Sequence, residues 1–187
     1  DRSQEAAERW LGNQIAETGF LSPLSSLETA NLSYNRISRL LLTDRLQSLH
    51  TIDVSHNDIS EVSITADRAL LHGINLSDNK LVTPGRLFLY VPALTELDLS
   101  HNRLRGMGKQ RCPNLEMLDV SNNQLITTEW IALQPRLKRL EMKHNRISDL
   151  SGFIHNNLFR QMSYLGLDQN PLSKQSFIEW LPLLVDA

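Results

Sequence analysis

Seven asparagines recur along the chain at nearly constant intervals, and this period constrains the fold more than any other feature of the sequence. The intervals are 22, 22, 23, 21, 22 and 25 residues. Each asparagine closes the phrase L-x-x-L-x-L-x-x-N-x-L, and every leucine slot of the phrase holds an apolar side chain. Such a period is typical of a solenoid built from one turn per repeat. The seven, which we call the asparagine ladder, are Asn35, Asn57, Asn79, Asn102, Asn123, Asn145 and Asn170.

The L-x-L part of each phrase predicts a short β-strand, because successive side chains of a strand face opposite sides. One repeat cannot bury its own leucines, so neighbouring repeats must stack. We expect an α/β solenoid, a right-handed horseshoe with seven short parallel strands on its concave face and turns or 3₁₀ pieces on its convex face. The ladder amides are expected to bond backbone groups of adjacent turns. Seven strands would make a sheet about 29 Å wide, which suits a protein partner.

The open ends of a solenoid expose leucines, so we expect a helical cap at each end. Residues 3–18 predict an amphipathic helix in which Trp10 covers the first repeat. Ser173 is expected to begin a second helix. The predicted division is an N-terminal cap over 1–26, seven repeats over 27–172 and a C-terminal cap over 173–187.

Polar side chains fill the outward slots of the strands and the slots just before each ladder asparagine. One reading is that these slots simply follow the repeat consensus. The other is an acidic binding surface with histidines, which would orient a partner by charge complementarity. On this reading, a partner binds the concave face through Tyr34, Asp53, His56, Asp78, Asp98, His101, Asp119, Glu141, Lys143 and His144.

Several classes of function are disfavoured. The chain has no phosphate-binding loop, dinucleotide fingerprint, hydrolase nucleophile elbow or zinc-protease motif, so we expect neither enzyme activity nor a cofactor. Nineteen basic residues against 21 acidic ones argue against nucleic acid. No apolar run reaches the roughly 20 residues that span a membrane. The single cysteine, Cys112, is either a buried, inert thiol or one half of an intermolecular bridge.

The repeat phrase resembles that of the leucine-rich-repeat family. Longer stretches, LHTIDVSHNDISEV, LTELDLSHNRL, LITTEWIALQPRLKRLEMKHNRI and LDQNPLSKQSFIEWL, resemble the leucine-rich immune proteins of mosquitoes, the LRIM/APL1 type. These 187 residues include neither the cysteine cap nor the coiled coil of those proteins. The resemblance implies a secreted haemolymph protein of innate immunity that scaffolds complement-like thioester proteins.

Two other classes of protein use the same scaffold, and the sequence leaves both open. The first is a cytoplasmic adaptor or regulatory subunit that binds a phosphatase, a cytoskeletal protein or a similar partner. The second is an effector of bacterial or viral type. All three hypotheses place the partner on the concave strands.

Overall fold

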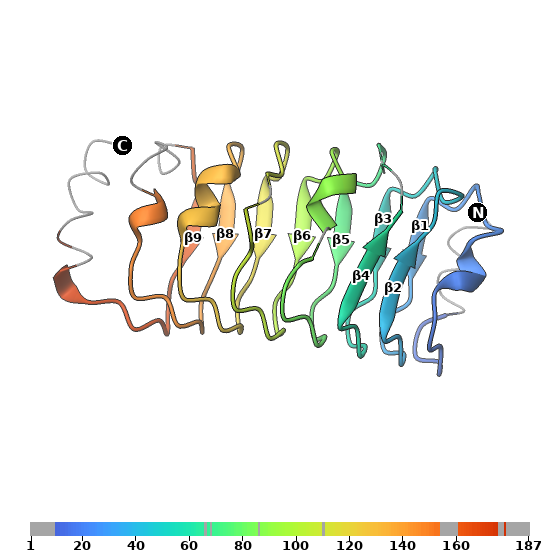
Figure 1. Ribbon diagram of the computed structural model, residues 1–187, viewed down its shortest axis with the longest axis horizontal. Helices are drawn as coiled ribbons and strands as arrows, with labels where there is room; N and C mark the ends of the chain where they lie inside the picture. The colour runs from blue at the N-terminus through green and yellow to red at the C-terminus, as the bar shows by residue number, and fades with distance from the viewer. Residues whose placement is uncertain are drawn as a thin grey trace.

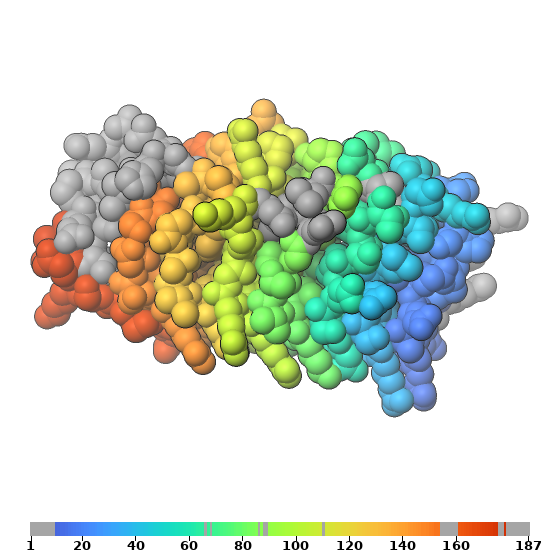
Figure 2. All heavy atoms as spheres, in the orientation of Figure 1, coloured from blue at the N-terminus to red at the C-terminus, as the bar shows by residue number. Residues whose placement is uncertain are grey.

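The computed structural model describes residues 10–65, 67, 69–85, 87–109, 111–153, 161–175 and 178. The chain winds into a row of turns that stack along one direction (Figure 1). In the space-filling view the repeats form successive bands across the molecule, each against its neighbours (Figure 2). The predicted solenoid of parallel strands is therefore confirmed.

Seven repeats each contribute one strand to a single parallel sheet, as the L-x-L pattern predicts. The period brings the same slot of each phrase to the same level, so that Ile52 pairs with Ile74 and Ile74 with Leu97. All three side chains are buried on the inner side of the sheet. The strands, in the order in which they pair, are β1 (Thr29–Asn31), β3 (Thr51–Asp53), β5 (Gly73–Asn75), β6 (Glu96–Asp98), β7 (Met117–Asp119), β8 (Arg139–Glu141) and β9 (Tyr164–Gly166).

The opposite side of the solenoid holds short 3₁₀ turns, as expected, and also two strands that the sequence analysis did not predict. These strands pair in parallel in front of β1 and β3 (Figure 1). They form because buried Leu40, Leu42 and Ile64 occupy strand positions that face the core. The elements are β2 (Arg39–Leu42), β4 (Glu61–Ile64), η1 (Gly19–Leu21), η2 (Leu87–Tyr90), η3 (Glu129–Leu133) and η4 (Ser151–Phe153).

The helix predicted over residues 3–18 is wrong for its second half; the first half lies outside the described residues. Residues 10–18 form turns and extended backbone instead. The reason is that Asn35 bonds their main chain. Its Oδ1 accepts a hydrogen bond from the Ile15 N–H at 3.0 Å, and its Nδ2 donates to the Trp10 carbonyl at 2.7 Å. Residues 10–18 therefore take the place of a preceding turn for the first repeat.

Residues 10–18 are in fact a truncated copy of the repeat. Asn13 stands 22 residues before Asn35 in the sequence. Gly12 has a φ of 69°, and the residue in the same slot of the next repeat, Tyr34, has a φ of 56°. The N-terminal end of the described chain is therefore closed by repeat-like backbone.

The predicted C-terminal cap lies mostly outside the described residues. Lys174 and Gln175 have helical backbone directly after Ser173. The other helical segments in the described ranges, each of three or more residues, are the 3₁₀ turns η1 to η4. The α/β class is thus corrected to a parallel β-solenoid with 3₁₀ turns.

Each asparagine of the ladder joins its own turn to the turn before it. Asn102 is representative: its Oδ1 accepts the Leu81 N–H at 2.9 Å, and its Nδ2 donates to the Leu76 carbonyl of the preceding repeat at 2.9 Å. The same amide nitrogen donates to the Leu99 carbonyl of its own repeat at 3.1 Å. All seven asparagines make this set of bonds. Buried backbone groups at the turns are thereby satisfied.

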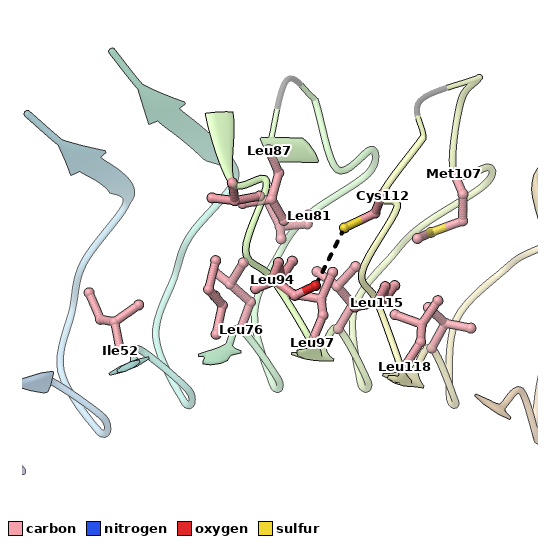
Figure 3. Packing of buried hydrophobic residues seen from close by; sticks show 14 of the residues in the cluster. Ile52, Leu76, Leu81, Leu87, Leu94, Leu97, Met107, Cys112, Leu115 and Leu118 are labelled. Atoms are coloured by element: carbon pink, nitrogen blue, oxygen red, sulfur yellow. Dashed lines mark hydrogen bonds between the residues drawn. The ribbon is translucent and has the colours of Figure 1, made fainter. Parts of the chain in front are cut away.

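Cys112 lies inside the core, between the strand layer and the opposite side. Its side chain is fully buried, and its Sγ lies 3.9 Å from the Leu94 carbonyl (Figure 3). Burial raises the pKa of the Cys112 thiol to about 11. This position favours the buried, inert thiol over an intermolecular bridge, since a bridge would require the sulfur at the surface.

We predict that Cys112 in the folded protein reacts with a thiol reagent such as DTNB at least about a hundredfold more slowly at pH 8 than in denaturant. The raised pKa leaves little thiolate, and burial blocks access to it. Absorbance of the released thiol measures the rate. Rapid stoichiometric labelling of the folded protein would contradict the prediction, and the denatured chain serves as the control because Cys112 is the single cysteine.

Candidate functional site

The outer surface of the seven-stranded sheet is a hollow of about 540 Å³ that extends over β1 to β8. Each strand places two residues on this side of the sheet, one before and one after its inward-facing middle residue. The first column holds Thr29, Thr51, Gly73, Glu96, Met117, Arg139 and Tyr164. The second column holds Asn31, Asp53, Asn75, Asp98, Asp119, Glu141 and Gly166.

The acidic side chains of the second column hold the turns that follow the strands. Oδ1 of Asp98 accepts the Ser100 N–H at 2.8 Å, and Oδ1 of Asp119 accepts the Ser121 N–H at 2.8 Å. Asp53 makes the same bond, as do Asn31 and Asn75. Aspartate and asparagine both favour such turns because either side-chain oxygen can accept the main-chain bond. The turn therefore accounts for the side-chain oxygen in these slots, but it does not account for the negative charge of the aspartates.

Partial burial raises the pKa of the Asp98 carboxyl above its usual range, and the like charges of Asp119 and Asp78 add to this effect. Hydrogen bonds from Ser100 act in the opposite direction. The folded protein thus disfavours the charged form of a side chain whose oxygen it needs. The Asp98 oxygen therefore stabilises the turn, whereas its negative charge is unfavourable, and a substitution can test the two effects separately.

We predict that Asp98→Asn raises the melting temperature by about 1 to 3 °C at neutral pH. The amide oxygen keeps the turn bond and the unfavourable charge is lost. A carboxyl whose folded pKa is raised loses stability as the pH climbs above its unfolded pKa, so the gain should vanish near about pH 3. Calorimetry at the two pH values measures this gain in melting temperature.

Asp58→Asn is the control, because Asp58 is paired with Lys80 at 2.6 Å and should show no gain. A loss of stability at neutral pH in Asp98→Asn would contradict the prediction.

The residues just before each ladder asparagine form a separate row, which we call the turn row. All seven have left-handed backbone with φ between 51° and 59°, although none is glycine. They follow the strands and do not line the hollow. The row comprises Tyr34, His56, Asp78, His101, Asn122, His144 and Gln169.

Neighbouring side chains of the turn row contact one another. The Tyr34 and His56 rings stack with centroids 4.1 Å apart. Oδ2 of Asp78 lies 3.7 Å from Nδ1 of His56, and its Oδ1 lies 3.9 Å from Nδ1 of His101. His101 also contacts the Asn122 amide at 3.2 Å. All the predicted binding residues except Lys143 thus fall into two groups, one in the hollow and one along its rim.

A polar cluster lies at the C-terminal end of the concave face. The Tyr164 hydroxyl donates to Oε2 of Glu141 at 2.6 Å, which raises the pKa of that hydroxyl, and the Arg139 guanidinium lies 3.9 Å from the centre of the Tyr164 ring. Nζ of Lys143 lies 3.9 Å from the same carboxylate oxygen. The Glu141 side chain is buried because Gly166 leaves room for it: a β-carbon at Gly166 would overlap Oε1 of Glu141.

The sequence analysis did not identify the first column as a set, and it missed Glu96 and Met117. The signal was available, because a strand with period two turns the residue before its middle leucine outward as well as the residue after it. Met117 is 40% exposed, the kind of apolar anchor that protein interfaces favour.

The described residues contain no group of three or more side chains placed to hold a metal ion. Among the same residues, no helix is long and apolar enough to cross a membrane. The surface that the structure does offer is an open one lined by both apolar and polar side chains. Leucine-rich-repeat folds typically serve as binding scaffolds rather than as enzymes.

Comparison with known proteins gives matches to the leucine-rich-repeat family models. Residues 92–132 match the model described as leucine rich repeats in two copies, and residues 45–65 match a single-repeat model. The leucine-rich-repeat domain of APL1B has a similar structure, with a TM-score of 0.67 and 28% identity, covering 86% of this chain and 46% of that one. The APL1 domain gives a TM-score of 0.62 and 26% identity, covering 87% and 49%.

Curated proteins match over shorter stretches. The alpha subunit of geranylgeranyl transferase type 2 from Mus musculus is 34% identical over 89 residues, which are 46% of this chain and 15% of the relative. Toll-like receptor 9 from Mus musculus is 26% identical over 103 residues, 52% of this chain and 10% of the receptor. The chain thus spans less than a fifth of these relatives and about half of the APL1 structures. Repeat phrase, solenoid and family models agree that the chain is built of leucine-rich repeats, and it resembles the LRIM/APL1 proteins of mosquitoes.

Proposed function

We propose that this chain is a protein-interaction scaffold that binds a partner protein on its concave face. The observation that carries the proposal is the open hollow of about 540 Å³ over β1 to β8. Glu96 and Met117 lie exposed near its middle and make none of the turn bonds that occupy the second column. A surface with both charged and apolar side chains free for contact is what a protein partner requires.

We further propose that the partner belongs to insect innate immunity and that the chain is secreted. This rests on the likeness to the APL1B and APL1 repeat domains, at 28% and 26% identity, together with the stretches that resemble the same family. A secreted thioester-type protein is the partner that this resemblance suggests. The scaffold would hold it without catalysing a reaction.

A second candidate is a repeat module within an intracellular enzyme or regulatory complex. The match that favours it is the 34% identity to part of the alpha subunit of geranylgeranyl transferase type 2. In that case the concave face would bind a cytoplasmic protein.

The test is capture of partners from insect haemolymph and from a cell lysate with three matched baits. The first is the unchanged protein. The second is Glu96→Lys with Met117→Lys on the concave face. The third is Val82→Lys with Ile126→Lys, two side chains that are about half exposed and do not line the hollow. Glu96 and Met117 suit this test better than Asp98 and Asp119, because the latter hold turns.

Loss of a thioester protein with the second bait alone would support both the concave site and the immune role. Capture of a cytoplasmic protein alone, again lost with the second bait, would favour the intracellular candidate. Capture that is equal with all three baits would overturn the concave-face proposal.

A further inference from the structure

We propose that the hollow above Gly73 is a socket for a lysine or arginine side chain on an extended segment of the protein partner. The inference rests on the proposed function and adds to it the chemistry of the partner. Three observations carry it: a missing side chain in the first column, unneutralised carboxylates around the gap, and a buried carboxylate oxygen at the end of the same hollow.

Gly73 interrupts the first column between Thr51 and Glu96, which lie beside it on β3 and β6. A β-carbon added at Gly73 would meet only the Thr51 side chain, with the nearest atom, Cγ2, at 3.2 Å. The second column has a comparable gap at Gly166, but there the Glu141 side chain occupies the space. Of the two glycines, Gly73 is the one above which the surface remains open.

Carboxylates surround this gap without a basic partner. Asp53 and Asp98 stand on either side of Asn75 in the second column, and Glu96 lies next to Gly73 in the first. Within the described part of the chain, no lysine or arginine forms an ion pair with any of these three carboxylates.

Three carboxylates on other surfaces of the protein do form ion pairs with basic side chains. Glu61 pairs with Arg39 at 2.9 Å, Asp58 with Lys80 at 2.6 Å, and Glu116 with Lys138 at 2.8 Å. Among the described residues, Arg139 is the one basic side chain that lines the hollow, and it stacks on Tyr164 two strands beyond Glu96. These three carboxylates outside the hollow thus have basic partners, whereas the three around Gly73 have none within the described part of the chain.

Glu141 lies at the other end of the same hollow, where its Oε2 accepts a hydrogen bond from Tyr164 and lies 3.9 Å from Nζ of Lys143. It is only 8% exposed, and its Oε1 has no hydrogen-bond partner among the described residues. A desolvated carboxylate oxygen without a donor is unfavourable. A cation that enters the hollow would offset part of this cost, because charges interact strongly where water is partly excluded.

The occupant is a side chain on an extended segment rather than a whole folded element. A hollow of about 540 Å³ falls within the range that holds one ligand of modest size. Its acidic side chains follow the strands in rows at about 4.8 Å spacing. A nucleic acid would be repelled by the same charges, and an acidic peptide likewise.

The test is an NMR titration of the ¹⁵N-labelled full chain with hexalysine, and with hexalysine acetylated on every side chain. We expect hexalysine to shift the amide signals of Gly73, Asp53 and Asp98 more than those of Asp58 and Glu61, and the acetylated peptide to cause no such shifts. Shifts spread evenly over all carboxylates would overturn the proposal. Spermine that bound as tightly as hexalysine would also overturn it, because the site would then take small cations generally.

Matched charge variants sharpen the test. Asp53→Asn with Asp98→Asn should weaken hexalysine binding at least about fivefold. Folding is preserved because asparagine already fills this slot at Asn31 and Asn75. Asp58→Asn with Glu61→Gln makes the same change in net charge elsewhere and should stay within about twofold. Equal weakening in both double variants would overturn the proposal.

Two further variants keep the proposal testable should the double variant fold poorly. Asn75→Asp adds a carboxylate beside the gap and should tighten binding, whereas Gly73→Leu fills the gap and should abolish it. Unchanged affinity in both would overturn the inference. If the hollow fails to bind hexalysine while Glu96→Lys with Met117→Lys still loses the native partner, the inference fails and the proposed function stands. If the hollow binds hexalysine but Glu96→Lys with Met117→Lys keeps the native partner, the proposed function fails, and only a cation-binding hollow remains.

Discussion

Asn102→Ala is expected to lower the free energy of unfolding by about 3 to 5 kcal/mol. The alanine would leave the buried Leu81 N–H of the preceding repeat without a partner, and the Leu76 carbonyl would keep only its bond from Asn79. It would also remove the bonds that fix the turn of its own repeat. Urea denaturation followed by circular dichroism measures the loss.

Asn114→Ala is the matched control. Asn114 also bonds a backbone carbonyl of the preceding repeat, that of Pro92 at 2.9 Å, but this bond is exposed to water. Water can replace it, so the change should cost no more than about 1 kcal/mol. Similar losses of unfolding free energy in the two variants would contradict the prediction, because burial would then add nothing to the stabilisation by the ladder amides.

Gly152→Ala is expected to destabilise the protein by about 3 kcal/mol or more. Gly152 is buried in η4, and its N–H donates to Oγ1 of Thr128 at 3.1 Å. An added β-carbon would overlap the Thr128 carbonyl group and lie 2.7 Å from the backbone nitrogen of Glu129. Backbone atoms cannot rotate away as a side chain can, so η3 and η4 would have to separate. Thermal unfolding followed by calorimetry measures the effect.

Gly106→Ala provides the comparison for that experiment. A β-carbon at Gly106 meets nothing within 4 Å, and the residue does not have positive φ. Its substitution should change stability by no more than about 0.5 kcal/mol in either direction. If Gly152→Ala proved equally mild, the packing of η3 against η4 would be looser than the structure describes.

Much of the fold could be predicted because it repeats. The seven asparagines and the alternation around each L-x-L locate all seven strands of the sheet and the residues that face the core. A feature that occurs only once in the chain cannot be recognised from a repeated sequence pattern in this way. The strands β2 and β4 occupy a part of the repeat whose sequence varies, and their pairing depends on two neighbouring repeats both placing apolar side chains in strand register.

The N-terminal error has a different origin. Ala7, Trp10, Leu11 and Ile15 follow a helical period, but Gly12, Asn13 and Ile15 also follow the repeat phrase. Hydrogen bonding to Asn35 decides between the two for residues 10–18, because the first complete repeat needs partners for its polar edge. The copy is visible in retrospect from Asn13, which stands one period before Asn35.

The candidate site was only partly accessible from the sequence. Position in the phrase shows that Asp98 faces outward, but not that its oxygen already accepts the Ser100 N–H. Nor does it show that the turn row adopts positive φ, which moves His56 and His101 from the strand face to its rim. The gap at Gly73 and the filled gap at Gly166 depend on which neighbouring side chain leans across, and this is a matter of three-dimensional packing.

The ladder also has a direction, and this matters while the chain is being made. Each asparagine reaches back to the turn before it: Asn57 bonds Ile37, and Asn170 bonds Ile147. A turn therefore receives its last hydrogen bonds from a residue synthesised about twenty positions later. On the ribosome, where the N-terminal part emerges first, every completed turn would be locked by its successor while the newest one stays open. Along the described array, the turns would therefore complete their hydrogen bonds in the same order in which they are synthesised.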